Sequence, residues 1–513
     1  MFAKVYSAAT FGIDALIVEV EIHIENQLPN FIIVGLPDNT VKESRERVIA
    51  AIKNSGFTFP SKKITINLAP ADVKKEGSAF DLPIALSILQ ANQNFEFNNL
   101  SDYLILGELS LDGYLRPIHG VLPICIKAKS AGFKGVILPE KNAIEASIVH
   151  GLDIYSATSL THCIEIINNI SNYNPVKTDI KKIFESSSEY PVDFSEVKGQ
   201  ENVKRALEVA AAGAHNILMI GPPGSGKTML ARRLPTILPT LTFEEALETT
   251  KIHSVAGLLK YDSPIVTNRP FRNPHHTSSD VALIGGGTYP RPGEVSFAHN
   301  GVLFLDELPE FKKNVLEVLR QPLEDRKVTI SRSKLTLEFP ANFMLLAALN
   351  PCPCGYYTDP TKECTCTLQQ IQKYVAKISG PLLDRIDIHV EVPAVKFKEL
   401  LSSSQGESSK TIRERVTRAR EIQLRRFKEH PGIYSNASMN SKLVKRFCVI
   451  DSIGEELLKN AITKLGLSAR AYDRILKVSR TIADLDGSER ILPHHLSEAI
   501  QYRSLDRSHW GLL

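Results

Sequence analysis

Residues 221–228 form a glycine-rich octapeptide with the residue types and spacing of a phosphate-binding loop, G-x-x-x-x-G-K-[ST]. Its residues are Gly221, Pro222, Pro223, Gly224, Ser225, Gly226, Lys227 and Thr228. Glycines let backbone N–H groups turn inward around phosphate, the lysine ammonium can reach the β- and γ-phosphates, and the threonine hydroxyl can bind Mg²⁺. An apolar run precedes the loop at 217–220, and a helical start follows it at 229–233. The sequence therefore predicts binding and hydrolysis of a nucleoside triphosphate.

Two carboxylates follow a second apolar run, residues 302–305. We expect Asp306 to hold Mg²⁺ through water and Glu307 to polarise the attacking water. A buried strand that ends in acids is where α/β folds place their chemistry. The pair therefore predicts the groups that bind the metal and activate water in the same nucleotide site.

A third apolar run, residues 343–349, ends in Asn350. Its side-chain amide could position water against the γ-phosphate. The alternative is an asparagine that only starts the turn before Pro351. The order of the three runs along the chain favours the functional interpretation.

Four of the seven cysteines lie in one short stretch after this third run. Cys352, Cys354, Cys364 and Cys366 could close a tetrahedral zinc site with four thiolates. The alternative is a group of reduced thiols, or a redox-sensitive one. We favour structural zinc, which would pin the loop after Asn350.

The composition is that of an ordinary soluble globular protein. Apolar residues make up 43% and charged residues 23% of 513 residues, and the net charge is +4. Nucleic-acid binding would therefore have to rely on local basic features. No apolar run approaches the roughly 18–20 residues that span a bilayer, and the first residues lack the pattern of a signal peptide. We expect a cytoplasmic protein without a membrane partner, whose cysteines are reduced.

The length predicts about three domains. Two polar stretches, 171–191 and 401–410, are interpreted as an interdomain linker and a flexible connector. They leave an N-terminal domain at 1–170, a central ATPase domain at 192–400 and a helical C-terminal domain at 411–513.

Strands and helices are predicted to alternate in the N-terminal domain. Strands are expected at 32–34, 64–68 and 135–139, and helices at 41–52, 82–89 and 124–131. This alternation predicts the α/β class, with α+β as the alternative for this domain. A helix predicted at 411–429 carries many arginines, which we interpret as a solvated face rather than a DNA-binding one.

The acid pair and the terminal asparagine resemble the Walker B motif and the first sensor of the AAA+ ATPases. Gly199 and Gln200 resemble the segment that lines the adenine pocket in that family, which implies ATP rather than GTP. Residues 379–387 resemble the arginine-finger segment of the Mg-chelatase and minichromosome-maintenance branch. This resemblance implies that Arg385 reaches the γ-phosphate bound by a neighbouring subunit.

Residues 467–474 resemble the second sensor of the same branch. The resemblance implies a phosphate contact by Arg470, with Arg474 as the alternative. For both arginines, and for Arg385, the other interpretation is a salt-bridged surface side chain.

Longer strings resemble the Mg-chelatase-like ComM/YifB family in particular. They lie at 271–279, 284–287, 290–295 and 350–355, and the likeness runs essentially from end to end. The family implies a hexameric ATPase that uses ATP and Mg²⁺ to drive branch migration of DNA in natural transformation and recombination. The implied partners are further copies of the chain, single-stranded and branched DNA, and recombination proteins.

Other functions fit parts of the sequence. One is a protein-remodelling ATPase similar to the motor subunit of magnesium chelatase, and another is an ATP-dependent protease. The additional N-terminal domain and the cysteine loop count against the first, since that motor subunit lacks both. The complete ATPase set counts against a non-catalytic scaffold.

Residues 328–337 are interpreted as two short strands around a basic tip. In AAA+ helicases a hairpin just before the first sensor projects into the central pore, which implies phosphate contacts by Arg332 and Lys334. The alternative is an ordinary exposed hairpin whose basic residues serve solubility.

The stretch 275–294 occupies the place of the helix-2 insert of this branch. Its three consecutive glycines predict a mobile loop that could follow the nucleotide state. We interpret His275 and His276 within it as structural residues rather than metal ligands.

The N-terminal domain resembles the proteolytic domain of Lon. Ser78 stands where that family carries its serine nucleophile, but Leu122 occupies the position of its lysine base and cannot take a proton. A serine without a base is a poor nucleophile. Lys74 and Lys75 are close in sequence, which does not establish geometry. We therefore expect no peptidase activity, and a module that aids hexamer assembly or DNA binding.

Overall fold

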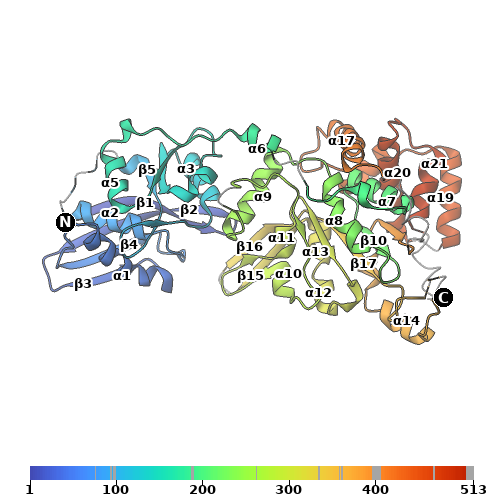
Figure 1. The fold of residues 1–513 in the computed structure, drawn as a ribbon, viewed down its shortest axis with the longest axis horizontal. Coiled ribbons are helices and arrows are strands. Elements are labelled where there is room, and N and C mark those ends of the chain that lie inside the picture. Colours follow the sequence, from blue (N-terminus) through green and yellow to red (C-terminus); the bar gives the residue numbers. More distant parts are fainter. Residues whose placement is uncertain are drawn as a thin grey trace. The chain divides into compact units, whose positions relative to one another are not determined.

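The chain folds into two compact units, each made from two segments of the sequence (Figure 1). Unit 1 comprises Met1–Ser187 and Phe243–Thr267, and unit 2 comprises Ser188–Thr242 and Asn268–Leu513. The chain therefore crosses between the units three times. The computed structural model describes residues 1–75, 77–92, 95, 97, 100–186, 190–260, 263–332, 335–357, 359, 362–394, 406–465 and 468–503.

Unit 1 is built on a mixed seven-stranded sheet in the order β3-β4-β2-β1-β5-β8-β9. Strand β2 runs antiparallel to both its neighbours, and the other pairs are parallel. The strands are β1 (Phe2–Phe11), β2 (Asp14–Glu25), β3 (Asn30–Val34), β4 (Lys63–Ala69), β5 (Tyr103–Ile105), β8 (Gly135–Pro139) and β9 (Asp153–Ala157), and a separate hairpin joins β6 (Glu108–Leu109) to β7 (Leu115–Arg116).

Helices of unit 1 come from both of its segments. They are α1 (Asn39–Asn54), α2 (Asp81–Ala91), α3 (Val121–Ser130), α4 (Ala143–Ala146), α5 (Leu160–Asn168), α6 (Ile180–Ser186) and α9 (Phe243–Val255). Helices α2 and α3 pack against β1 and β2, and α9 packs against α3. At the end of α9, the Ser254 hydroxyl donates to the Glu145 carboxylate over 2.5 Å. Segment 243–267, which the sequence assigned to the central domain, is thus part of unit 1.

Unit 2 is built on a parallel five-stranded sheet in the order β11-β14-β17-β10-β18. The strands are β10 (Ile217–Ile220), β11 (Phe271–Arg272), β14 (Val302–Leu305), β17 (Met344–Leu349) and β18 (Ile388–Glu391). Every residue of β10, β14 and β17 is buried. Parallel strands covered on both faces have such continuous apolar runs, so the three runs seen in the sequence are the middle of this sheet.

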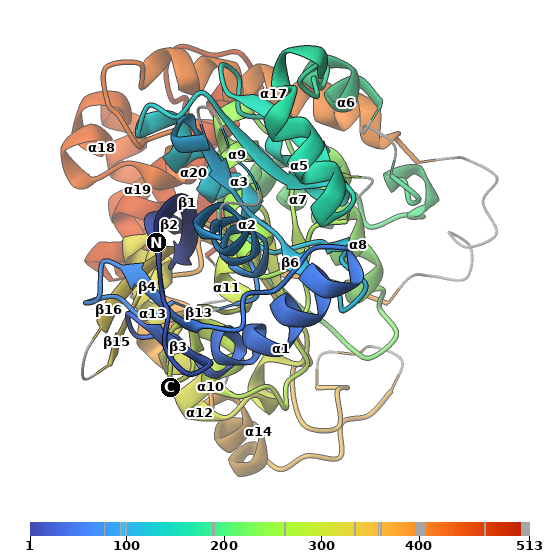
Figure 2. The ribbon, with the colours of Figure 1, turned by 90° about the vertical axis from the view of Figure 1, so that its left-hand side faces the viewer.

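Some helices of unit 2 come from the same part of the chain as this sheet, and the others follow it as a C-terminal group. They are α7 (Glu201–Gly213), α8 (Lys227–Ile237), α10 (Asp280–Ile284), α11 (Glu294–Phe297), α12 (Lys313–Glu317), α13 (Arg320–Asp325), α14 (Leu368–Val375), α15 (Gly380–Leu383), α17 (Ser409–Arg426), α18 (Ser441–Phe447), α19 (Ser452–Leu465), α20 (Ala469–Leu485) and α21 (Pro493–Gln501). Helices α19, α20 and α21 lie side by side in Figure 1, and α18 lies beside α20 in Figure 2.

Two short hairpins leave the sheet of unit 2. One pairs β12 (Gly285–Gly286) with β13 (Arg291–Pro292), and the other pairs β15 (Lys327–Arg332) with β16 (Leu335–Pro340). The α/β class and the helical C-terminal region are as predicted. None of the helices among the described residues is both long and apolar enough to cross a membrane.

The two polar stretches contain helical residues that the sequence analysis did not predict there. The stretch interpreted as a linker contains α6, whose first N–H groups are capped by the Asp179 carboxylate at 3.1 and 3.4 Å. Helix α17 begins inside the expected connector, because Ser408 caps it, and ends at Arg426 rather than 429. Three of its arginines are used inside the chain: Arg415 pairs with Glu208, Arg420 donates to backbone carbonyls, and Arg426 pairs with Asp484.

Candidate nucleotide-binding site

The glycine-rich octapeptide connects β10 to α8, in the middle of the unit 2 sheet. Helix α8 begins at Lys227, and its N-cap Gly226 has a φ of 88°, a conformation that glycine adopts without steric cost. The N-terminus of α8 therefore follows the loop directly, as anion binding by a helix N-terminus requires.

Lys227 is buried and holds the loop together. Its ammonium donates to the carbonyls of Gly221 and Pro222, over 2.8 and 2.9 Å, and to Asn350 Oδ1 over 3.2 Å. Burial lowers the pKa of Lys227 to about 8, against the opposing effect of the Asp306 and Glu307 charges. The structure thus brings the lysine and the asparagine predicted from separate strands to one point.

Thr228 and Asp306 lie close together at the carboxyl ends of the strands of unit 2. The Thr228 hydroxyl donates to Asp306 Oδ2 over 2.7 Å. A hydroxyl and a carboxylate at hydrogen-bond distance are the hard oxygen ligands that Mg²⁺ accepts, directly or through water. The residues present therefore fit the metal that the sequence predicted for them.

Glu307 follows Asp306 in a left-handed backbone conformation, with a φ of 52°. Its N–H donates to Asp306 Oδ1 over 3.1 Å. Its carboxylate lies 3.4 Å from Nδ1 of His276, a residue that the sequence suggested only as structural. The contact depends on a segment that precedes Glu307 by about thirty positions, and no sequence signal indicated it.

Gln200 supports the loop from the other side. Its amide Nε2 donates to the carbonyls of Ser225 and Pro393, over 2.8 and 2.9 Å. Gln200 adopts a left-handed conformation directly after Gly199 and precedes α7. Gln200 therefore lies beside the phosphate loop, and the adenine contact implied for Gly199 and Gln200 stays a prediction.

Arg385 is buried, with 5% of its surface exposed. It follows α15, and its guanidinium pairs with Glu324 and donates to the Pro381 carbonyl of the same chain. The single chain thus holds the predicted arginine finger in an intramolecular ion pair.

The two candidate sensor arginines of α20 have different surroundings. Arg470 is exposed. Arg474 is ion-paired with Asp387, a buried residue that also accepts the N–H of Asn216 at 3.1 Å. Burial favours a higher pKa for Asp387, but the charges of Arg474 and His215 hold this pKa well below its usual range. Arg474 therefore joins the C-terminal helices to the segment after Arg385, whereas Arg470 stays exposed.

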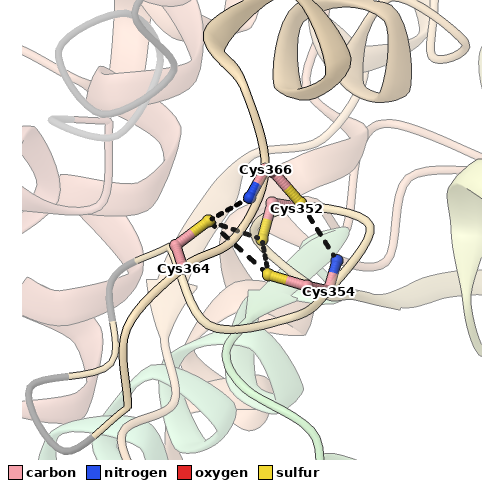
Figure 3. Close-up of side chains that lie close together, drawn as sticks. All are labelled: Cys352, Cys354, Cys364 and Cys366. Carbon is pink, nitrogen blue, oxygen red and sulfur yellow. Dashed lines mark hydrogen bonds between the residues drawn. The ribbon is translucent and has the colours of Figure 1, made fainter.

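The four cysteine thiols lie together in the loop after β17 (Figure 3). Cys352 Sγ lies 3.3 Å from Cys354 Sγ and 3.7 Å from Cys364 Sγ, and Cys366 Sγ accepts the N–H of Cys354. A tetrahedron of four sulfurs at a Zn–S distance of about 2.3 Å has edges of about 3.8 Å. Burial works against ionisation, but backbone N–H groups lower the pKa of Cys354 to about 6. The cluster therefore fits a zinc ion.

This cysteine loop lies against the phosphate loop. A Cβ atom on Gly355 would lie 2.6 Å from Cδ of Pro223, so only glycine fits there. Gly355 N–H also donates to Cys352 Sγ over 3.2 Å. The loop that carries the cysteines thus packs directly on Pro223 of the phosphate loop.

A second group of metal-ligating residues does not fit a metal. Asp486 Oδ2 lies 3.2 Å from Nε2 of His495 and 3.8 Å from Nε2 of His494. However, Nδ1 of His495 accepts the N–H of Leu492 at 3.0 Å, which places the proton of a neutral imidazole on Nε2. A nitrogen that carries a proton offers no lone pair to a metal, so the neutral His495 ring only faces the Asp486 carboxylate near the start of α21.

Arg332 lies at the exposed end of β15. Its Nε donates over 3.2 Å to the carbonyl of Gly287, next to the β12–β13 hairpin. Lys334 lies outside the described residues. The two hairpins of unit 2 are therefore joined at the residue predicted to contact DNA.

Ser78 in unit 1 is bound to a carboxylate. The Ser78 hydroxyl donates to the Glu108 carboxylate, and the buried Lys75 ammonium donates to the Pro70 carbonyl. Leu122 lies at the start of α3, where its N–H donates to Glu145 Oε1 over 3.0 Å. Lys75 is thus bound to a backbone carbonyl, and Ser78 to a carboxylate.

Three family models match the chain. They are described as Magnesium chelatase, subunit ChlI at residues 193–400, Subunit ChlI of Mg-chelatase at 20–142, and Magnesium chelatase, subunit ChlI C-terminal at 406–503. The first two correspond to large parts of unit 2 and unit 1, and the third to the C-terminal helices. This family implies ATP and Mg²⁺ as ligands, in agreement with the site geometry.

Individual proteins are similar to this chain, two of them over almost its whole length. Competence protein ComM of Haemophilus influenzae is 46% identical over 509 residues, which cover 98% of each chain. Uncharacterized protein YifB of Escherichia coli is 44% identical over 506 residues, which cover 98% of this chain and 97% of that one. Lon protease 2 of Bacillus subtilis is 27% identical over 189 residues, about a third of each chain. This chain therefore belongs to the ComM/YifB family of Mg-chelatase-like AAA+ ATPases.

Proposed function

We propose that this chain is an ATP-driven ring motor that moves branched DNA, and so promotes branch migration in natural transformation and recombination. The observation that carries the motor part is the meeting of Lys227, Thr228, Asp306 and Asn350 at one edge of a parallel sheet. The likeness to a competence protein over 98% of both chains supports the DNA-processing part. In this role the protein works in the cytoplasm.

Each residue of the site has a separate task in this proposal. Lys227 exchanges its carbonyl partners for β- and γ-phosphate oxygens, and Thr228 and Asp306 hold the metal. Mg²⁺, when bound, would neutralise charge on the transferring phosphate. Glu307 accepts a proton from the attacking water, and Asn350 orients that water.

The DNA contact is proposed for the β15–β16 hairpin. Arg332 is exposed, and Lys334 follows it by two positions in the sequence. Contacts of this kind go to phosphates, so binding would be tolerant of sequence and sensitive to salt. Arg332→Ala is expected to weaken DNA binding on all sequences and to reduce the salt slope by about one unit.

ATP turnover with and without DNA tests this function. We would compare no DNA, single-stranded DNA and a mobile four-way junction, with Lys227→Ala as the blank. Strong stimulation by DNA, together with conversion of the junction into its products, is expected. Turnover that ignores every DNA would instead support a protein-remodelling ATPase similar to the motor of magnesium chelatase.

Arg385 is proposed to act on the nucleotide of a neighbouring subunit in a ring, which we take to be a hexamer. Its partner Glu324 has a side chain that is 53% exposed, so the pair can open when another copy approaches. Arg470 would contact phosphate from the C-terminal helices. Mixing Arg385→Ala subunits with Lys227→Ala subunits is expected to restore partial turnover. No recovery above either variant alone would count against a finger acting between subunits.

The cysteine cluster is proposed to hold one structural zinc ion. The expected metal content of purified, reduced protein is one zinc for each chain. Cys364→Ser is expected to lose the ion, and Cys163→Ala, a core cysteine in unit 1, is expected to keep it. Zinc-free wild-type protein under reducing conditions would leave the four cysteines as plain thiols.

A further inference from the structure

Segment 425–449, which spans the end of α17, the following loop and α18, carries much of the positive charge of the chain. It contains six Lys and Arg residues and a single acidic residue, Glu429, so its net charge is +5. The whole chain has a net charge of only +4, and the rest of it is therefore close to neutral. A local concentration of basic residues of this kind is typical of a surface that binds a polyanion.

Most of these cations are exposed and unpaired. Arg426 is the exception, because it pairs with Asp484 in the interior of the C-terminal helices. In the part of the chain that the structure describes, none of the other five side chains forms an ion pair with a carboxylate. We call these five residues the α18 basic surface: Arg425, Lys428, Lys442, Lys445 and Arg446. The protein itself therefore leaves their charge available to a ligand.

Aromatic contacts bring the two parts of this surface together. The ring of Phe447, at the end of α18, lies 5.8 Å from the ring of Phe427 and 6.4 Å from that of His430, measured between centroids. The Arg446 guanidinium lies 5.1 Å from the centroid of the Phe447 ring. The exposed cations on either side of Phe427 are therefore close to those at the end of α18. Helix α18 packs on α20 and lies at the edge of the C-terminal helices in Figure 2.

The three cations of α18 lie on one face of the helix. Lys442 precedes Lys445 and Arg446 by three and four positions, whereas Leu443 and Val444 are buried. Like charges at these spacings destabilise a helix. Cations in the last turn are favoured by the helix dipole, which accounts for Lys445 and Arg446 but not for Lys442 in the first turn. Helix stability alone therefore does not explain this arrangement.

The spacing of these charges suits a nucleic-acid backbone. Lys442 and Arg446 are four residues apart, which is about 6 Å along a helix axis. A DNA strand has one phosphate for about 3.4 Å of its axis, so one face of α18 covers about two phosphates. Arg425 and Lys428, from the end of α17, extend the cationic surface beyond α18.

We propose that the α18 basic surface binds the phosphate backbone of DNA, as a contact additional to the β15–β16 hairpin. The proposed function places DNA only at that hairpin, so this surface is a second site on the same unit. It holds DNA by charge and is tolerant of sequence, and it increases affinity without taking part in ATP hydrolysis.

The test compares two double variants that remove the same charge. Lys445→Gln with Arg446→Gln removes two cations from the last turn of α18, and Lys127→Gln with Lys129→Gln removes two exposed cations from the last turn of α3. Both pairs lose a similar interaction with a helix dipole. The measurement is the Kd of labelled duplex and single-stranded DNA between about 50 and 200 mM salt.

The α18 variant is expected to bind duplex DNA about tenfold more weakly at the lowest salt, with a salt slope smaller by about two units. For single-stranded DNA the slope is expected to fall by about 1.4 units. The α3 variant is expected to keep both wild-type slopes. Lys445→Arg with Arg446→Lys, which conserves the charge, is expected to keep them as well. ATP turnover without DNA is expected to be the same in all these proteins.

The outcomes separate the second DNA site from the motor function. An unchanged slope in the α18 variant overturns the site, even if DNA stimulates ATP turnover. An equal loss in the α3 variant also overturns it, because net charge rather than this surface would then control binding. A reduced slope in the α18 variant alone, with turnover that ignores DNA, would support the site and count against the motor. Melting temperatures show whether each variant is folded.

Discussion

The nucleotide site of unit 2 and the Ser78 region of unit 1 both place a reactive side chain near the start of a helix, and they differ in its partners. In unit 2 the Lys227 ammonium contacts Asn350, and the Thr228 hydroxyl contacts Asp306. In unit 1 the Ser78 hydroxyl contacts the Glu108 carboxylate. The first set contains the phosphate-binding and metal-binding groups of phosphoryl transfer, whereas in the second Leu122 stands where the resemblance places a lysine base.

The difference shows that the contacts that stabilise a fold can be separate from the groups that carry out a reaction. Beside Ser78, the carboxylate of Asp81 is fully buried and paired with Arg47, whose Nε lies 2.7 Å from Asp81 Oδ2. Burial raises the pKa of Asp81 to about 6, and Arg47 and the Leu109 N–H oppose that rise. These polar groups fix the start of α2 and the β6–β7 hairpin. Unit 1 can therefore retain its architecture without the proton transfer that a serine hydrolase requires.

Glu307→Gln is expected to give the largest effect and to test whether unit 2 is the catalytic region. Removal of a general base lowers turnover by about 10²–10⁴-fold. ATP binding is expected to persist, because the substitution leaves Lys227, Thr228 and Asp306 in place. Single-turnover hydrolysis and equilibrium binding of a fluorescent ATP analogue would be measured together. Normal hydrolysis would reassign the base to another residue.

Lys227→Ala is expected to give the next largest effect. Loss of a charged donor to the phosphates lowers turnover by about 10²–10³-fold, and nucleotide binding weakens as well. The measurement is ATP turnover over a range of ATP concentrations, with the Cys163→Ala variant as a control for purification. Unchanged turnover would remove the phosphate-loop assignment.

The pH dependence of ATP affinity sharpens the comparison further. With the pKa of Lys227 lowered to about 8, its ammonium is charged below that pH and neutral above it. Only the charged form attracts phosphate, so affinity is expected to be constant below this pKa and to fall by about tenfold for each pH unit well above it. Lys227→Arg, whose guanidinium stays charged, is expected to flatten the profile. A wild-type profile that is equally flat would show that Lys227 stays charged throughout.

Ser78→Ala is expected to give the smallest effect. Turnover of ATP should stay within about twofold of the wild type, as for substitutions away from a site. Peptidase activity on an unfolded protein substrate is expected to equal the blank in both proteins. Cleavage by the wild type that disappears in Ser78→Ala would restore the serine as a nucleophile, and would then require a base other than Leu122.

The sheet of unit 2 and its polar edge could be predicted because parallel strands covered on both faces have a strong local signal. The run Ile217–Ile220 contains only apolar residues and is followed by the phosphate loop, so both the strand and its end are visible in the sequence. The same holds for Val302–Leu305 and the two acids that follow. Strand ends in parallel sheets meet at one edge, and for that reason the predicted residues lie together.

Features that depend on distant pairing could not be predicted. The ion pair of Arg385 with Glu324 joins residues 61 positions apart, and nothing near either residue indicates it. The contact of His276 with Glu307 requires the left-handed turn at Glu307, which its neighbours in the sequence do not require. The assignment of 243–267 to unit 1 likewise rests on tertiary contacts. Local sequence patterns specify helices and strands, but they do not specify which of these a segment such as 243–267 will pack against.

A single truncation therefore cannot remove unit 1, because this unit is made of two separate segments. The chain passes between the units after Ser187, after Thr242 and after Thr267. A protease that cuts within 171–191 leaves segment 243–267 joined to unit 2 by two covalent connections, and the N-terminal fragment then stays attached only through noncovalent contacts such as the packing of α3 against α9.

A fragment that starts at residue 188 would still contain α9. Its buried residues Ala246 and Ile252 would then be exposed to water, and so would Ser254 without Glu145. Poor solubility of such a fragment would reflect an orphaned helix rather than a role of unit 1 in the activity. An informative truncation removes 243–267 together with residues 1–187 and joins the two remaining ends with a short flexible linker.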